Sequence, residues 1–145
     1  MNKNQFLIAL SESTQADFGR KEFAQQSSPQ KTFSAIWELE SQVNNGGFDQ
    51  YFCNSDSDII AYSPKALREI GATACAAIVE SALQVIDPLP DDCDARQEAI
   101  DAAGEKGEER LNELDAQFFA YPDNLTELLF AFVAKHPNEF GPIPK

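Results

Sequence analysis

Helix-breaking residues divide this chain into segments whose apolar residues recur at helical spacing. The alternation of polar with β-branched or aromatic residues that marks β-strands is nearly absent. Serine-proline pairs predict helix starts at Ser28-Pro29 and Ser63-Pro64, and Gly46-Gly47 predicts a stop between them. The pattern therefore predicts an all-α fold built from several helices.

The second half of the chain continues this succession of helices and breaks. A largely buried helix is predicted from Ala72 to Ile86, and Asp87-Pro88-Leu89-Pro90 ends it. Gly104 and Gly107 separate two further helical pieces, and an apolar helix follows, with expected ranges of 94–103, 106–120 and 125–135. No repeat or long linker divides the chain, so we expect one compact domain over residues 1–145.

Length and composition support a single packed core. A chain of 145 residues with 43% hydrophobic residues buries about two-thirds of its unfolded surface, so it needs no disulfide in order to fold. No apolar run approaches the roughly 20 residues that span a bilayer. Residues 6–10 are too short for the core of a secretory signal. We therefore expect a soluble, cytoplasmic protein that does not bind membranes.

The three cysteines, Cys53, Cys75 and Cys93, are odd in number and far apart. No C-x-x-C pair suggests zinc binding or redox chemistry, and a reducing cytoplasm fits such a set best. Cys53 has no neighbouring cation that would activate it, so we interpret it as an inert buried thiol.

Acidic residues outnumber basic ones by 24 to 11, which gives a net charge of −13. Thirteen acids and three bases lie between Asp87 and Glu127, so this segment carries −10 of that charge. Such a surface repels nucleic acid and anionic membranes and attracts cationic partners. We therefore expect no direct binding of nucleic acid.

The most unusual stretch is VNNGGFDQYFCN, residues 43–54. It offers no nucleophile with an adjacent base, because the sole histidine, His136, lies far along the chain. Its glycines lack the lysine and the preceding strand of a phosphate-binding loop. The better interpretation is a folded corner, in which the glycines end a helix, the asparagines cap it and the aromatic residues enter the core.

Among metal sites, a calcium-binding loop is the one that this region matches in part. Asn54, Asp56 and Asp58 have the first spacings of a calcium-binding loop. However, Ile59 and Lys65 stand where such a loop requires glycine and glutamate. We therefore expect turn formation and capping by these residues, and no metal or other cofactor.

Nine residues of the stretch resemble the signature of a bacterial domain-of-unknown-function family, the DNA mimic protein 19-like family: Asn44, Asn45, Gly46, Gly47, Phe48, Gln50, Tyr51, Phe52 and Asn54. Further similarity lies in residues 66–72, 111–118 and 128–140, so the resemblance covers about 28–141. Residues 1–27 form an extension that we expect to be helical. The resemblance implies an all-helical fold and, for the named member, an acidic surface that imitates duplex DNA on a transcription factor.

Acidic residues after Pro90 recur at steps of three and four. On a continuous helix they form one stripe with Cβ atoms about 5–6 Å apart, and their tips can reach the roughly 7 Å spacing of successive phosphates. Three bases, Arg96, Lys106 and Arg110, are available to relieve the repulsion. The candidate partner-binding acids, which would stand for phosphates, are Asp91, Asp92, Asp94, Glu98, Asp101, Glu105, Glu108 and Asp115.

These observations favour a non-enzymatic protein, monomeric or homodimeric, whose acidic stripe binds a basic nucleic-acid-binding protein. An immunity or antitoxin-like inhibitor that also uses aromatic anchors is the alternative. A third interpretation is an enzyme in which two of Glu38, Glu40, Asp49 and Asp56 converge in a cleft. A merely solvated acidic face is open as well.

Overall fold

The computed structural model describes residues 2–12 and 21–140, and these residues form helices without any β-strand. The prediction of an all-α fold is therefore confirmed. The elements in chain order are α1 (Lys3–Ser11), η2 (Phe23–Gln25), α2 (Ser28–Asn54), α3 (Ser57–Glu69), α4 (Thr73–Val85), α5 (Cys93–Phe119), α6 (Leu125–Lys135) and η3 (Pro137–Glu139), of which η2 and η3 are short 3₁₀ helices.

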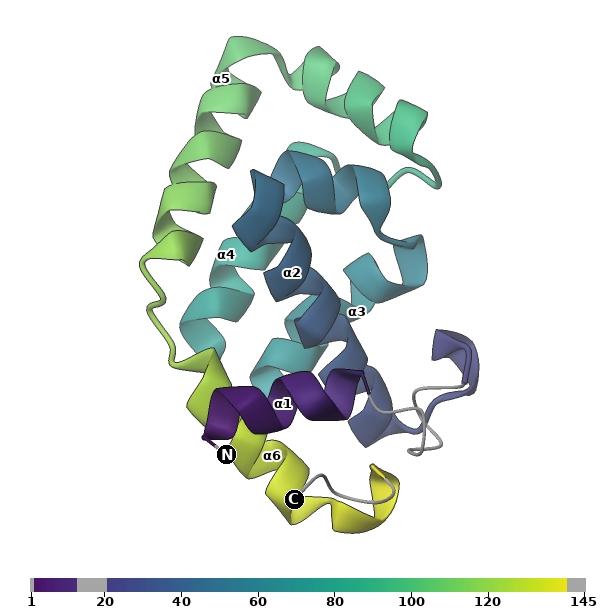
Figure 1. Ribbon diagram of the computed structural model, residues 1–145. Helices are drawn as coiled ribbons and strands as arrows, with labels where there is room; N and C mark the ends of the chain where they lie inside the picture. The colour runs from purple at the N-terminus through teal and green to yellow at the C-terminus, as the bar shows by residue number, and fades with distance from the viewer. Residues whose placement is uncertain (1, 13–20, 141–145) are drawn as a thin grey trace.

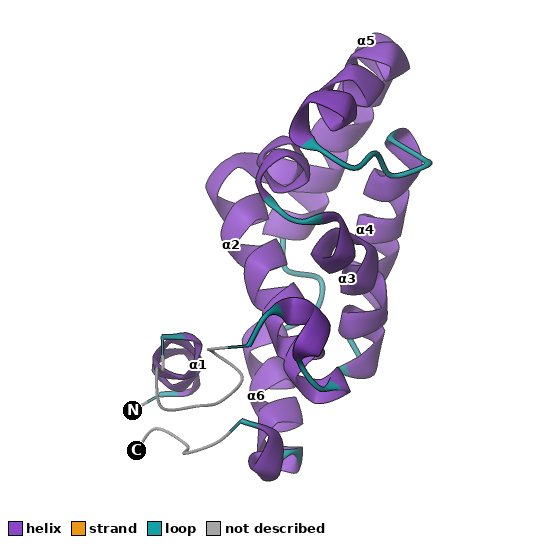
Figure 2. Ribbon diagram, turned by 90° about the vertical axis from the view of Figure 1, so that its right-hand side faces the viewer, coloured by secondary structure: helices purple, strands orange, loops and turns teal. Residues whose placement is uncertain are grey.

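Helix α2 runs through the middle of the molecule and packs against α3 and α5, and α4 packs against α3 and α5 (Figure 1). The first half of α5 crosses one end of the molecule, and its second half descends beside α4 (Figure 1). Helices α1 and α6 pack together at the opposite end (Figure 2). Helix α5, which contains most of the acids that lie between Asp87 and Glu127, thus forms one outer edge of the fold.

The glycine pair bends α2 instead of ending it outright. Gly46 has φ −157° and ψ 21°, and Gly47 has φ 73° and ψ −173°, so the helical dihedrals are interrupted for two residues. After the bend, Phe48, Tyr51 and Phe52 are all fully buried. The bend therefore turns a second run of apolar residues into the core. Only glycine adopts the Gly47 conformation without strain.

Two serine-proline pairs predicted helix starts, and one of these two predictions is wrong. The N-cap of α2 is Ser27, one residue before the predicted Ser28, and its hydroxyl accepts a hydrogen bond from the Gln30 N–H. The predicted helix start at Ser63-Pro64 is wrong, because α3 already begins at Ser57. Within α3 the Ser63 hydroxyl donates to the Ile60 carbonyl at 2.7 Å. That carbonyl is the one from which Pro64 withholds its usual N–H, so the serine compensates for the proline.

Helix α5 changes direction at Gly104, where φ is 72° and ψ is −165° (Figure 1). The predicted division of this region into two helical pieces is therefore confirmed. In both pieces the residues that face α2 and α4 are buried, namely Arg96 and Ile100 before the bend and Gly107, Leu111, Leu114 and Phe118 after it. The opposite faces of both pieces are turned to solvent.

Two of the three cysteines form a disulfide, Cys53–Cys93, which contradicts the expectation of free thiols. Bending of α2 brings its last turn beside the first residue of α5, across 40 residues of sequence. The spacing of residues along the sequence does not predict such a contact. Cys75 is the free cysteine, and burial raises the pKa of its thiol to about 12.

The Arg96 side chain joins the end of α2 to the start of α5 at the same corner. Its Nη1 donates to the carbonyls of Phe52 at 3.0 Å and Ser55 at 2.8 Å, and its Nε donates to the carbonyl of Pro90 at 2.8 Å. Its Nη2 donates to the Asp91 carbonyl and the Ser57 hydroxyl. Arg96 is only 2% exposed. All the donors of the guanidinium fork are thereby used, and two of them bond the Phe52 and Ser55 carbonyls at the end of α2.

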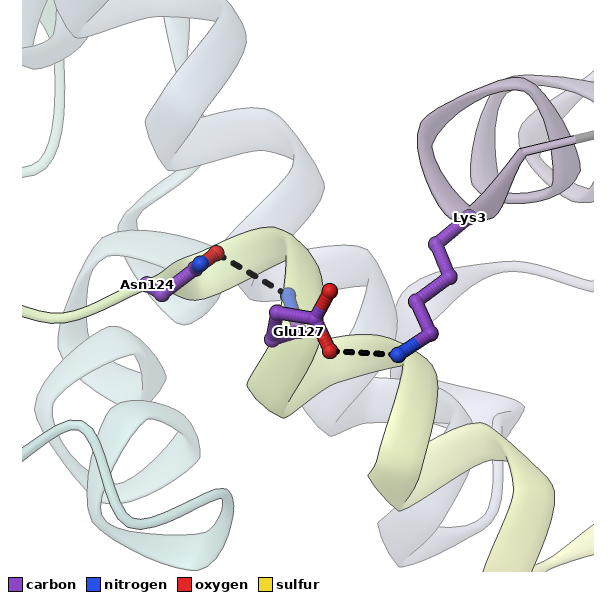
Figure 3. A network of polar contacts seen from close by, with 3 residues as sticks. All are labelled: Lys3, Asn124 and Glu127. Carbon is purple, nitrogen blue, oxygen red and sulfur yellow. Dashed lines mark hydrogen bonds and ion pairs between the residues drawn. The ribbon is translucent and has the colours of Figure 1, made fainter.

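Helix α1 lies against α6, and its contacts include an ion pair and a pair of aromatic rings. Lys3 Nζ lies 2.5 Å from the Glu127 carboxylate, and the Glu127 backbone N–H donates to the side-chain oxygen of Asn124 (Figure 3). The rings of Phe6 and Phe130 meet edge to face at 5.1 Å. Of the N-terminal extension over residues 1–27, the structure describes α1 and η2, whereas residues 13–20 lie outside the described part of the chain.

Replacing Gly47 by alanine should destabilise the protein more than replacing Gly104. The two glycines have nearly equal φ, but a Cβ at Gly47 would lie 2.5 Å from Asp115 Oδ2, whereas nothing lies within 4 Å of one at Gly104. Backbone strain costs about 1–3 kcal/mol at either position, and moving the Asp115 carboxylate at Gly47 adds about 1.5–3 kcal/mol for its lost hydrogen bond. Urea unfolding of G47A and G104A measures the difference, and equal losses would disprove the role of the Asp115 contact.

Removing the Arg96 guanidinium should destabilise the protein by about 3 kcal/mol or more, because R96A leaves buried carbonyls without donors. R96K should lose less, since an ammonium retains the charge but supplies three donors instead of five. R110A is the control, because Arg110 is exposed and contacts only Glu113 in the described structure. All variants are compared by urea unfolding with the disulfide intact. A loss in R96K no larger than in R110A would contradict the role of Arg96.

Candidate functional site

The signature residues of 43–54 lie at the bend of α2, and the side-chain amides of Asn45, Gln50 and Asn54 form a hydrogen-bonded group with Gln42. Asn45 Nδ2 donates to Gln50 Oε1 at 3.2 Å, and Gln50 Nε2 donates to Gln42 Oε1 at 2.8 Å. Asn54 Nδ2 donates to the same Gln42 oxygen at 3.1 Å. Gln42 precedes the bend, whereas Gln50 and Asn54 follow it. These amides therefore hold the two halves of α2 together.

Asn44 differs from its signature neighbours because it contacts another part of the chain. Its Nδ2 donates to the Tyr121 hydroxyl at 2.6 Å, and that hydroxyl donates to the Glu40 carboxylate at 3.4 Å. Tyr121 has a positive φ of 50°, which is uncommon for a bulky residue. Burial raises the pKa of Glu40 to about 7, and the Tyr121 hydroxyl opposes that rise. This group was not recognised from sequence, since Tyr121 lies 77 residues from Asn44.

The acids of the expected stripe do not all share one environment. Asp94, Glu98, Asp101, Glu105 and Glu108 are exposed on the solvent face of α5, and none forms an ion pair with another described residue. Glu109 and Glu113, which were not among the predicted site residues, face solvent as well. We call the exposed acids of α5 the acidic arm: Asp94, Glu98, Asp101, Glu105, Glu108, Glu109 and Glu113.

Asp91 and Asp92 lie in the loop that precedes the acidic arm. Both residues are exposed. Asp92 is the N-cap of α5, and its carboxylate accepts from the Ala95 N–H at 2.8 Å. The carbonyl of Asp91 accepts from Arg96, which leaves its carboxylate free to face solvent. Both charges extend the field of the arm at the N-terminus of α5.

Asp115 is placed differently from the rest of the predicted stripe. It is half-buried, and its Oδ1 accepts from the Phe48 N–H at 2.9 Å, just after the bend of α2. Burial raises the pKa of Asp115, the Phe48 hydrogen bond opposes that rise and nearby Asp49 adds to it. Its carboxylate caps the second part of α2, so we leave Asp115 out of the acidic arm.

The bases that were expected to relieve the acids are less available than their number suggests. Arg96 is buried and directed at carbonyls, so its guanidinium does not reach the solvent face. Arg110 pairs with Glu113 at 3.3 Å, and both side chains are exposed. Lys106 is exposed and forms no ion pair with a described residue. The solvent face of α5 is therefore more acidic than the sequence count indicates.

The bend at Gly104 shapes the arm. Asp94, Glu98 and Asp101 belong to the piece before it, and the other four acids belong to the piece after it. Because both pieces turn their buried residues toward α2 and α4, the exposed acids lie on the opposite, solvent-facing sides of the two pieces. The stripe that this spacing would form on a continuous helix is thus divided into two rows that meet at an angle.

The four carboxylates considered for enzyme chemistry have separate contacts. Glu38 accepts from Ser55 at 2.7 Å and from Gln42 at 3.2 Å, whereas Glu40 accepts from Tyr121. Asp49 and Asp56 are exposed, and Asp56 is the N-cap residue of α3. The described residues include no group of three or more His, Cys, Asp or Glu side chains placed to hold a metal ion. Within the same part of the chain, every helix is too short or too polar to cross a bilayer.

Comparison with known proteins gives one match. No curated protein and no solved structure is found to match this sequence. A family model described as DMP19-like protein matches residues 24–136, which include the signature and the whole of α2 to α6. Residues 1–23, including α1, lie outside that match. Because the model covers most of the chain and its signature forms the bend of α2, the protein belongs to the DMP19-like family.

Proposed function

We propose that the acidic arm binds the basic, DNA-contacting face of a nucleic-acid-binding protein such as a transcription factor. The observation that carries the proposal is the exposure of the seven arm acids, of which only Glu113 pairs with a described base. The family to which the chain belongs adds support, since DMP19-like proteins take their name from a DNA mimic. No catalytic step is part of the proposal.

The spacing of the arm suits a partner that recognises phosphates. Acids three and four residues apart on a helix have Cβ atoms about 5–6 Å apart, and flexible side chains can widen that spacing to about 7 Å between carboxylates. The bend places the two rows on a convex outline, which can enter a concave DNA-binding face. Like charges at these spacings destabilise an isolated helix by a few tenths of a kcal/mol per pair, and a cationic partner would relieve that repulsion.

A cytoplasmic location belongs to the same proposal, because a DNA-binding partner would be met there. The structure contains the Cys53–Cys93 disulfide, and disulfides are rare in that compartment, so the redox state of this pair in cells tests the location. Alkylation of both cysteines inside cells, found by mass spectrometry, supports the cytoplasmic location. An intact Cys53–Cys93 disulfide in freshly quenched cells would place the protein in an oxidising compartment instead.

The decisive test compares two triple variants with equal changes in net charge. The arm variant is E98Q/E105Q/E108Q, and the control variant is E12Q/E22Q/E69Q, whose glutamates are exposed elsewhere on the molecule. Each is used at low salt to capture binding proteins, and captured proteins are then tested for displacement from their DNA. We expect the wild type and the control to displace a DNA-binding protein, and the arm variant to lose at least tenfold in affinity.

Salt dependence provides an independent check on the same complex. Binding by the arm should weaken steeply between about 50 mM and about 500 mM salt, because exposed charges are screened beyond a Debye length. An affinity that stays constant over this range would rule out phosphate mimicry. Equal weakening in the arm and control variants would show that only net charge matters.

One observation keeps the inhibitor alternative in view. Phe119, at the end of α5, is 48% exposed, and Tyr121 just beyond it is 44% exposed. Large exposed aromatic residues beside charges often anchor protein interfaces. If F119A weakens the captured complex more than the arm variant does, the protein acts as a shape-recognising inhibitor and the acids only steer its association.

A further inference from the structure

A pocket of about 240 Å³ opens between α1, α2 and α6, away from the acidic arm. Leu7 and Ile8 of α1 and Trp37 of α2 supply its apolar wall. Glu40 and Asn44, one helical turn apart on α2, supply its polar wall. Helix α1, which lies outside the family match, therefore closes one side of a space whose floor belongs to the family domain.

Glu40 is a carboxylate without a cationic partner among the described residues. Its hydrogen bond comes from the Tyr121 hydroxyl, which Asn44 holds in place. The nearest candidate cation on α1, Lys3, is directed at Glu127 on α6 instead (Figure 3). Burial of a carboxylate with no neighbouring positive charge disfavours its ionised form. When Glu40 is ionised, its negative charge therefore has no compensating positive charge among the described residues.

The lining fits one class of ligand. A primary ammonium group has three donors and no acceptor, and the Glu40 carboxylate together with the amide oxygen of Asn44 offers acceptors. An attached alkyl chain would pack against Leu7, Ile8 and Trp37, and an indole face also attracts cations. An anionic ligand is disfavoured because the pocket lining contains no basic residue.

We propose that this pocket binds a primary alkylammonium group, with Glu40 as its counter-ion. The group could be a free amine or the lysine side chain of a partner protein, since both present the same chemistry. The site shares no residue with the acidic arm, so this proposal does not depend on the function proposed above.

The proposal has a definite pH dependence. Glu40, whose pKa is raised to about 7 by burial, has to be ionised to pair with the ammonium. Affinity should therefore rise as pH increases through about 7 and fall only when the amine itself loses its proton, near about 10.4. The other titratable groups near Glu40 are Tyr121, Cys75, Asp123 and the Lys3–Glu127 pair. The pKa of the Cys75 thiol is raised to about 12, and Asp123 accepts a hydrogen bond from the Cys75 N–H. Burial raises the pKa of Tyr121, so its hydroxyl stays neutral in this range.

The experiment is a titration of the full chain with n-butylamine, followed by calorimetry or by Trp37 fluorescence. We expect saturable binding with a Kd on the order of 1 mM, a value typical of so small a ligand. E40Q should weaken it at least tenfold, whereas E69Q, which removes an exposed carboxylate elsewhere, should leave it unchanged. n-Butanol, which has the same chain without the charge, should not compete.

Two further measurements complete the test. Nα-acetyl-lysine amide, titrated in the same way, separates the sources: binding equal to that of butylamine shows that a lysine side chain fits the site, and binding of butylamine alone restricts the site to a free amine. The wild type, titrated at about pH 5.5 and about pH 8, gives a readout that needs no variant. Absence of saturable binding, equal affinity in E40Q or a flat pH profile would each overturn the proposal, without bearing on the acidic arm.

Discussion

The Arg96 guanidinium is the interaction on which the rest of the structure depends, because it joins the end of α2, the loop before α5 and α5 itself. A cation at the C-terminal end of a helix is favoured by the helix dipole, and here it also donates to carbonyls that the helix leaves unpaired. Its partners are carbonyls and one hydroxyl, without a carboxylate. The positive charge of Arg96 is therefore used inside the fold by these hydrogen bonds, and it does not compensate the acids on the solvent face of α5.

Two glycine bends complete the same geometry. The bend at Gly47 turns Phe48, Tyr51 and Phe52 into the core, and Asp115 of α5 caps the backbone there. The bend at Gly104 lets α5 cover first the end of the molecule and then its side. One acid is thereby taken from the surface for packing, while seven others remain on the outer side of α5. The candidate binding surface is thus a product of how the core is assembled.

The two proposed sites use carboxylates in different ways. The arm acids are exposed and numerous, so they act through a long-range field that salt can screen. Glu40 is single and partly buried beside Asn44 and Tyr121, so desolvation governs its behaviour and a ligand must supply the missing charge. A partner that presents both a basic face and a protruding lysine could engage both, but neither site needs the other.

The sequence by itself determined the fold class, the positions of most helices and the excess of acids after Pro90, because these follow from local periodicity and composition. It also indicated that residues 43–54 form a corner, since glycine and aromatic residues have local preferences. It failed where distant segments meet. The Cys53–Cys93 disulfide, the burial of Arg96 and the capping by Asp115 each join residues at least 40 positions apart. Only the tertiary structure decided which acids face solvent and which charge lies inside, because desolvation and hydrogen bonding depend on neighbours in space that no sequence spacing records.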